Sequence, residues 1–222
     1  MKRAEILIPY LILTVITAMV VFLSGCKKTE NPIKYPKGTF PDSVYNIEGL
    51  NSAFDDYNAN IYHIGSRFPI IFSSNRGSSG GQFNLVQGAL WYYFDQFNGN
   101  FTIDSEIESD LFYGTIISKA NTPGDDLGPY SIFSSADGYE YLILSSQTVS
   151  GDLDLYFLKH LPRYANIAPE VTGPLPVTLF NTAGNESYIS FDTNADSAYF
   201  SSDRGGNFDI HVHGKSAQTT LE

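Results

Sequence analysis

The segment Ala198–Val212 reads Ala-Tyr-Phe-Ser-Ser-Asp-Arg-Gly-Gly-Asn-Phe-Asp-Ile-His-Val, and it decides the predicted fold. Apolar and aromatic residues stand at both ends, and two serines precede a middle part rich in Asp, Gly and Asn. Aromatic and β-branched residues favour strands, whereas Gly with Asn or Asp favours a tight turn. The segment therefore predicts a strand, a turn and an antiparallel partner strand.

Two earlier parts of the chain repeat this pattern. Residues 72–77 read Phe-Ser-Ser-Asn-Arg-Gly, and residues 139–146 form a second apolar run that ends in Ser-Ser. Each unit begins at an asparagine, with 70 and then 60 residues between the starts, and an acidic or amide pair follows four residues later. The starts are Asn51, Asn121 and Asn181, and the pairs are Asp55/Asp56, Asp125/Asp126 and Asn185/Glu186. Such self-similarity predicts a repeat architecture.

The first unit also contains the signals for a fourth strand. Residues 89–94 are apolar and aromatic, Asn98-Gly99 is a hairpin signal, and a further strand begins at Phe101. Four short antiparallel strands per unit are typical of a propeller blade. We therefore expect an all-β, propeller-like fold with about three four-stranded blades over residues 46–215, followed by a polar tail over 216–222.

The third unit resembles the repeat of TolB-type β-propellers, in which a Ser-Asp-Arg-x-Gly-like turn leads into Asp-Ile-Tyr-Val. Residues 72–77 match this motif well, and the resemblance covers about residues 47–215. The second unit departs from it, because Gln147-Thr148-Val149 contains no arginine. The resemblance implies a propeller fold and a role in the bacterial envelope, where such propellers contact a peptidoglycan-associated lipoprotein. It implies little about activity, because propellers host many functions.

The number of units leaves the closure of the propeller open. Propellers usually have 4–8 blades, and blade repeats typically span about 40–50 residues. Long loops between the units explain the wider spacing, or a degenerate blade lies around Tyr164 to Val177. The interpretation favoured here is a partial or truncated propeller, whose open strand edges invite pairing with another chain.

The first 25 residues predict an export signal. Lys2 and Arg3 precede an apolar run from Ile6 to Leu23, and Leu23-Ser24-Gly25-Cys26 resembles the bacterial lipobox. That resemblance implies acylation of Cys26, the only cysteine of the chain, and cleavage before it. The alternative is an uncleaved membrane anchor, because the run is about long enough to span a bilayer. Residues 26–45 contain three prolines and four lysines, and they predict a flexible tether that lies outside the cytoplasm.

Composition and the missing motifs narrow the functional classes. The net charge of −11 argues against nucleic-acid binding, because phosphate backbones repel an acidic surface. The chain has no Gly-x-Ser-x-Gly elbow and no phosphate-binding loop, and the Gly77–Gly81 run predicts only a turn. We therefore expect no enzyme, no catalytic residues and no cofactor.

Two patterns have the residue types of a metal site. Asp192, Asn194, Asp196 and Asp203 superficially fit a calcium loop, but Ser197 stands where glycine is needed and a strand follows. His211 and His213 share one strand face, with Asp209, His63 or His160 as a third ligand. An Asx-rich blade turn and half-exposed blade histidines are the preferred interpretations, so no metal is expected.

Three further groups of residues have a functional and a structural interpretation. Asn75-Arg76 and Asp203-Arg204 occupy corresponding turns and predict either ligand contacts on one propeller face or a structural role. The structural role is favoured, with the acidic residue capping the turn and the arginine packing between blades or pairing with a neighbour. An acidic run and a nearby aromatic run could together form a glycosidase site, since paired carboxylates catalyse the hydrolysis of glycosidic bonds and aromatic rings stack on sugars. The favoured interpretation is a solvated edge for the acidic run and blade packing for the aromatic run. The acidic run is Asp104, Glu106, Glu108 and Asp110, and the aromatic residues are Trp91, Tyr92 and Tyr93.

These observations predict an envelope lipoprotein without catalysis, held to the outer membrane by lipid on Cys26 on the periplasmic face or at the cell surface. Its propeller-type domain would bind another envelope protein as a scaffold. The alternative function is a surface lipoprotein that binds or processes glycans, favoured by the 15 tyrosines and 16 phenylalanines.

Overall fold

The computed structural model describes residues 34, 44–61 and 67–214 of the 222-residue chain. The predicted signal peptide, Cys26, most of the predicted tether and the predicted tail at 216–222 lie outside these described residues.

The first sheet contains strands β1 (Asp56–Ile61), β2 (Arg67–Ser74), β3 (Asn84–Asp95) and β4 (Asn100–Ile107), in that order. A short 3-10 turn, η1 (Arg76–Ser78), connects β2 to β3. At the β3–β4 turn, Gly99 has a φ of 73°, a conformation that glycine adopts without steric cost. The predicted fourth strand and the Asn98-Gly99 hairpin are both confirmed.

The second sheet contains β5 (Asp126–Phe133), β6 (Glu140–Gln147), β7 (Leu153–His160) and β8 (Val171–Pro176). The third contains β9 (Glu186–Phe191), β10 (Ser197–Ser202) and β11 (Asp209–Gly214). The fold is therefore all-β with three antiparallel sheets, and the third has three strands within the described residues rather than the four expected. The alternative of an extra blade around residues 164–177 is wrong, because β8 is the fourth strand of the second sheet.

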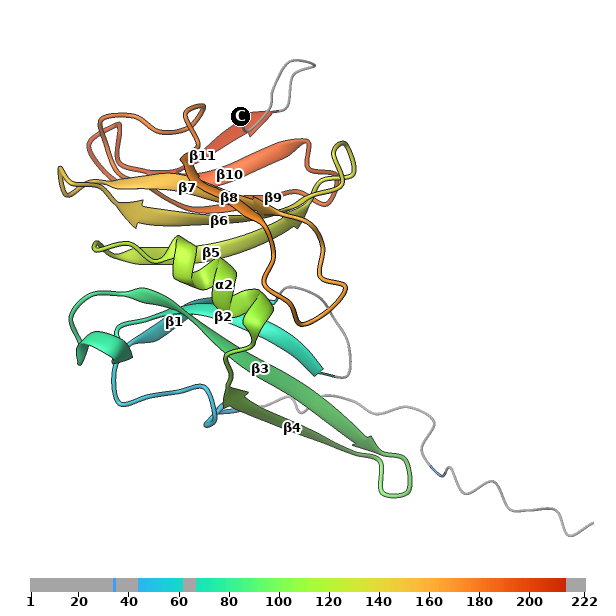
Figure 1. Cartoon of the computed structure of the whole chain (residues 1–222). Coiled ribbons are helices and arrows are strands. Elements are labelled where there is room, and N and C mark those ends of the chain that lie inside the picture. The colour runs from blue at the N-terminus through green and yellow to red at the C-terminus, as the bar shows by residue number, and fades with distance from the viewer. Residues whose placement is uncertain (1–33, 35–43, 62–66, 215–222) are drawn as a thin grey trace, which may run out of the picture. The chain divides into compact units, whose positions relative to one another are not determined.

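The three sheets follow one another in chain order and pack face to face (Figure 1). The first strand of each sheet contacts the first strand of the next, so β5 lies between β1 and β9. Core clusters cover both faces of β2 and of β6, so these two strands are almost wholly buried, which their continuous apolar sequences require. One core cluster lies between the first two sheets and a second between the last two.

Helix α2 (Leu111–Ala120) lies in the chain between the first and second sheets, and the sequence patterns did not predict it. Asp110 begins the helix, because its side chain accepts a hydrogen bond from the backbone N–H of Tyr113 at 2.8 Å. Phe112, Tyr113 and Ile116 bury the inner face of the helix in the core between the two sheets. The helix accounts for the longer spacing between the first two units.

Candidate functional site

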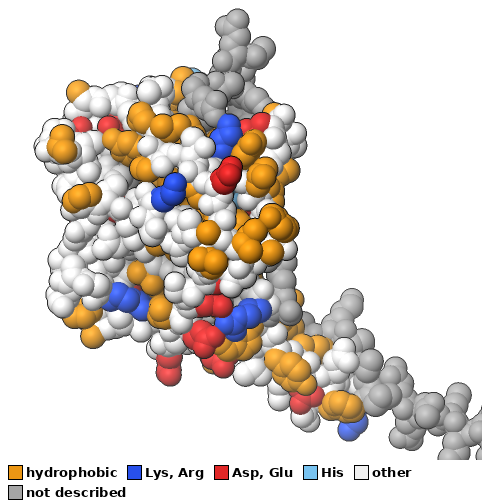
Figure 2. Space-filling model, viewed as in Figure 1, with side chains coloured by type: hydrophobic (Ala, Val, Ile, Leu, Met, Phe, Trp, Pro, Cys, Tyr) orange, Lys and Arg blue, Asp and Glu red, His pale blue; other side chains and the backbone are white. Residues whose placement is uncertain are grey.

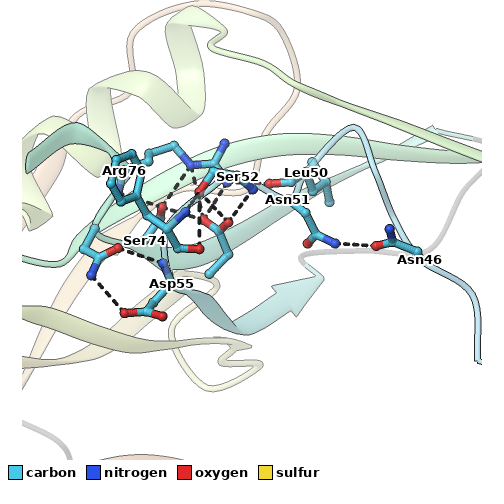
Figure 3. Close-up of polar contacts among 10 residues, drawn as sticks. Asn46, Leu50, Asn51, Ser52, Asp55, Ser74 and Arg76 are labelled. Carbon is cyan, nitrogen blue, oxygen red and sulfur yellow. Dashed lines mark hydrogen bonds and ion pairs between the residues drawn. The ribbon is translucent and has the colours of Figure 1, made fainter. Parts of the chain in front are cut away.

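Ser52, Ser74 and Arg76 point toward one another where the chain enters β1 (Figure 3). They surround the carboxylate of Asp56, whose side chain is 9% exposed. One oxygen of Asp56 accepts hydrogen bonds from the backbone N–H and the hydroxyl of Ser52, both at 2.7 Å. The other oxygen accepts from Ser74 Oγ and from Arg76 Nη2, both at 2.6 Å. Arg76 Nη2 also donates to the carbonyl oxygen of Leu50. The network therefore ties together the residues before β1 and the end of β2.

The third sheet repeats this network with a longer acid. Glu186 is fully buried and accepts hydrogen bonds from Thr182 and from Ser202 Oγ, the latter at 2.6 Å. Arg204 Nη2 lies 3.3 Å from Glu186 Oε1 and donates to the carbonyl oxygen of Phe180 at 2.6 Å. Each arginine also stacks on a phenylalanine of its own sheet, since 5.1 Å separates the guanidinium from the ring centre of Phe72 or Phe200. Both arginines therefore lie within their own repeats, in internal turn contacts.

The residue before each arginine makes a second reciprocal pair. Asn75 Oδ1 accepts from the backbone N–H of Asp55, and its amide donates to the Asp55 carboxylate. In the third sheet the two residue types are exchanged, since Asp203 accepts from both the backbone and the side-chain amide of Asn185. These two hydrogen bonds hold the pKa of Asp203 below its usual value.

The second sheet keeps the carboxylate and loses the arginine. Asp126 is fully buried and accepts from Thr122 N at 2.6 Å and from Ser146 Oγ at 2.7 Å. Thr148 stands where the other repeats have arginine, and Leu144 stands where they have the stacking phenylalanine. The second repeat therefore lacks both the guanidinium and the aromatic ring on which it stacks.

This difference changes the acidity of the two aspartates. Burial raises the pKa of both carboxyl groups, because it disfavours the charged form. At Asp56, the hydrogen bonds from Ser74, Arg76 and Ser52 outweigh burial and lower the pKa from 3.8 to about 2. At Asp126, hydrogen bonds from Thr122 and Ser146 do not outweigh burial, so its pKa is raised.

The asparagines that start the second and third repeats bind the backbone of the preceding sheet. The side chain of Asn121 accepts from the backbone N–H of Leu85 at 2.8 Å and donates to the carbonyl oxygen of the same residue at 3.1 Å. Asn181 makes the same two hydrogen bonds with Leu155, both at 2.9 Å. These contacts pair backbone groups near the start of β3 and of β7. The carbonyl oxygen of Leu155 also accepts from the backbone N–H of Val177, directly after β8, at 2.8 Å.

Two more links recur at each junction between sheets. Asp125 Oδ1 accepts from Phe83 N, and Asn185 Oδ1 accepts from Leu153 N, both at 2.8 Å. The first serine of each Ser-Ser pair also accepts from the next sheet, Ser73 Oγ from Gly128 N at 3.0 Å and Ser145 Oγ from Tyr188 N at 3.3 Å. Gly128 and Tyr188 have positive φ angles of 59° and 56°, at bulges in the first strands of their sheets.

The third sheet leaves its outer face open, and we call its apolar residues Tyr199, Phe208, Ile210 and Val212 the open face. Ile210 lies opposite Ser201 in the sheet, as Leu85 lies opposite Ser73 and Leu155 opposite Ser145. Leu85 and Leu155 are 2% and 0% exposed, whereas Ile210 is 77% exposed. Within the described residues no strand pairs with the outer edge of β11. The open face is therefore a candidate protein interface.

A charged hollow of about 600 Å³ lies beside helix α2, on the first and second sheets. Arg163 pairs with Asp110 at 2.6 Å, and Arg67 pairs with Glu106 at 2.6 Å and Glu108 at 3.3 Å. Figure 2 shows basic and acidic side chains side by side between α2 and β4. Burial raises the pKa of Tyr113 in this hollow to about 12, so its phenol remains protonated at neutral pH.

The residues with metal-site patterns have structural partners. Asp192 Oδ1 accepts from the backbone N–H groups of Asp196 and Ser197, which closes the β9–β10 turn. The rings of His211 and His213 do share one face of β11, where they pack on Phe200 and Phe180. His160 is buried elsewhere, and His63 lies outside the described residues. In the part of the chain that is described, no three His, Cys, Asp or Glu side chains gather as metal ligands.

The residues of the acidic run and of the aromatic run lie in different elements and have different surroundings. Asp104 and Glu106 belong to β4, Glu108 follows that strand, and Asp110 begins helix α2. In the aromatic run, the guanidinium of Arg67 stacks on the ring of Trp91 at 4.5 Å from the ring centre, while the side chain of Tyr93 is 65% exposed. Residues 76–78 of the glycine-rich turn form η1, and the rest of that turn leads into β3.

The links between sheets were missed by sequence reasoning, although the sequence contained their signal. The starting asparagines and the Ser-Ser pairs were recognised only as marks of the repeat. Their recurrence at fixed places was the available clue to a shared contact, since a polar residue retained in every repeat usually has the same partner.

No protein-family model matches this chain, and no curated protein matches it either. Among the described residues no helix is long and apolar enough to cross a membrane.

Proposed function

We propose that this chain is a lipid-anchored protein of the bacterial envelope whose three-sheet domain is part of a β-propeller and docks another protein without catalysis. The observation that carries the docking function is the open face, where Ile210 is 77% exposed while its counterparts in the other sheets are buried. The anchor rests on the lipobox-like sequence that ends at Cys26.

The propeller assignment is supported by the way the sheets follow one another. Each sheet packs on the next through its first strand, and the same three links recur at both junctions. In propellers, sheets of this kind repeat around an axis, so that every inner sheet has a neighbour on each side. The third sheet has a neighbour on one side only within the described residues.

The chemistry of the open face suits a protein partner. Ile210 and Val212 of β11 and Phe208 directly before this strand are each more than half exposed. They lie along a strand whose outer edge carries backbone N–H and C=O groups without a paired strand in the described residues. An edge of this kind recruits a further strand through backbone hydrogen bonds, while the apolar side chains provide the buried area.

A site-specific cross-linking experiment tests the docking function. The full chain is expressed with a photoreactive amino acid at position 210, or at position 149 as a control, since Val149 is exposed in the β6–β7 turn. We expect a protein cross-link from position 210 in intact envelopes and none from position 149. The proposed function fails if position 210 gives no cross-linked polypeptide.

The anchor has its own test. An inhibitor of the lipoprotein signal peptidase should leave the precursor uncleaved, and Cys26→Ser should abolish incorporation of labelled fatty acid while the chain is still exported. Unchanged processing under the inhibitor would contradict the lipobox assignment, and it would favour the uncleaved membrane anchor.

The second candidate function is glycan binding, favoured by the charged hollow beside α2. Its rim carries Arg163, Asn166 and Tyr164, and the Tyr164 side chain is 80% exposed. Arginine and amide groups bind hydroxyls, and a tyrosine ring stacks on a sugar face. A glycan array with the wild type and Tyr164→Ala tests it, because binding that survives the substitution would remove the hollow as the site.

A further inference from the structure

Residues at the start of the first sheet correspond to those with which the second and third repeats contact the sheet before them. Asn51, Asp55 and Asn58 stand where Asn121, Asp125 and Gly128 stand in the second repeat. Asn58 even has the same positive φ, 55°, as the bulge residue Gly128. All three are exposed, and no sheet precedes them in the described residues. The amide of Asn51 donates to Asn46 within the same loop.

Residues at the end of the third sheet correspond to those on the other side of these contacts. At each internal junction, three groups of one sheet form hydrogen bonds with the next repeat. They are a backbone N–H and C=O, a second backbone N–H and a serine hydroxyl. At the first junction they belong to Leu85, Phe83 and Ser73, and at the second to Leu155, Leu153 and Ser145. Their counterparts are the Ile210 backbone, the Phe208 N–H and the Ser201 hydroxyl. Each end of one chain is thus complementary to the opposite end.

We infer that the occupant of the open face is a second copy of this chain, which docks the start of its first sheet there. The inference rests on the proposed docking function and names its partner. The expected contacts are the Asn51 side chain with the Ile210 backbone, Asp55 with Phe208 N–H, and the Asn58 N–H with Ser201 Oγ. They copy the internal junctions with the same residue types or with close substitutes.

The number of sheets in the described residues gives the number of copies that we infer for a closed ring. A contact between opposite ends of identical chains either closes into a ring or continues as a filament. The described residues form three sheets, and closed propellers usually have 4–8 blades. One copy has too few sheets and three copies would have nine, so two copies with six sheets are the arrangement that closes. The two junctions between the copies are then identical and related by a two-fold axis.

Cysteine cross-linking between two differently tagged full chains tests this inference. One carries Phe54→Cys and the other Asn207→Cys. Their counterparts Gly124 and Gln82 meet at the first internal junction, where Gln82 Nε2 donates to the Gly124 carbonyl at 2.6 Å. When the two are co-expressed in envelopes, a short bis-maleimide should join one copy of each. Each variant alone should give no product, which also controls for Cys26.

A pair of surface variants ties the product to the open face. Ile210→Asp should reduce the cross-linked product at least tenfold, because it places a charge in the predicted contact. Val149→Asp changes a residue that is even more exposed but lies in a turn, and it should leave the product unchanged. Circular dichroism of both variants checks that the sheets remain folded.

The remaining outcomes separate the inference from the function on which it rests. A photo-cross-link from position 210 to a different polypeptide, without the cysteine product, overturns the second copy and leaves the docking function in place. No cross-link of either kind overturns both. A product from one variant alone, or a ladder of three and more chains, overturns the closed pair.

Discussion

The first and second sheets bury the same kind of carboxylate in two different ways. Asp56 shares its hydrogen bonds with the guanidinium of Arg76, which stacks on Phe72. Asp126 has only hydroxyl and backbone donors, because Thr148 occupies the place of the arginine. The third sheet follows the first, with Glu186 and Arg204. The chain therefore contains two versions of the network with a counter-ion and one without it.

The difference teaches what each part of the network contributes. The serine and threonine donors recur in all three sheets, so they are sufficient to fix the backbone before the first strand. The arginine adds charge neutralisation, and it also bonds the carbonyl of the residue before the starting asparagine in the first and third repeats. In the second repeat, that carbonyl belongs to Ala120, the last residue of helix α2.

The largest expected effect comes from replacing the two aspartates by asparagine. Asp56→Asn removes the anion that pairs with Arg76, whose side chain is only 20% exposed to water. Because a largely buried guanidinium then has no counter-ion, we expect a loss of about 3 kcal/mol of unfolding free energy. Asp126→Asn keeps partners that can donate or accept, so its cost should stay within about 1 kcal/mol. Urea unfolding followed by the fluorescence of Trp91 measures both, and equal costs would contradict the comparison.

Removing the arginines should convert the first and third networks into the second type. Arg76→Met keeps the apolar stem and should cost about 2 kcal/mol, the range for a hydrogen bond to a charged group. Arg204→Met should cost about half as much, because a third of the Arg204 side chain is exposed to water. Thr148→Met is the matched control, and unfolding curves that show the same cost at all three positions would contradict the counter-ion role.

The two aspartates should affect acid stability with opposite signs. Asp56 has a pKa of about 2 in the folded chain, below its ordinary 3.8, so its contribution is present above pH 4 and is lost as the pH falls toward 2. That loss should be about 2 kcal/mol, and Asp56→Asn should abolish it. The pKa of Asp126 is raised, so stability should fall as the pH rises from 3.8 through that higher value. Asp126→Asn should flatten this part of the curve.

The smallest expected effect comes from adding the missing arginine. Thr148→Arg should lower the pKa of Asp126, as measured by carboxyl NMR, and add less than about 1 kcal/mol of stability. The gain is small because Leu144 offers no aromatic ring to the guanidinium and because Thr148 loses its hydrogen bond to Asp152. Ser150→Arg, two residues further along the same turn, is the control. A pKa that falls equally in both variants would contradict a specific pair.

Much of the sheet architecture could be predicted from local patterns. The Ser-Ser strand followed by an Asp-, Gly- or Asn-rich turn marked β2, β6 and β10, and the hairpin signal at Asn98-Gly99 marked β4. Helix α2 could not be predicted in this way, because Leu111–Ala120 contains threonine, glycine and two isoleucines, which are poor helix formers. Burial between two sheets stabilises this helix, and that environment exists only in the folded chain.

The sequence alone determined the repeat and the Ser-Ser strands with their turns, because apolar runs and glycine conformations act over a few neighbouring positions. Only the tertiary structure decided what the recurring polar residues contact. Asn121 meets Leu85 across 36 residues of sequence, and the same type of residue at Asn51 meets no preceding sheet in the described part of the chain. Whether such a side chain closes a junction or leaves one open depends on which sheet lies beside it, and only packing between distant segments sets that.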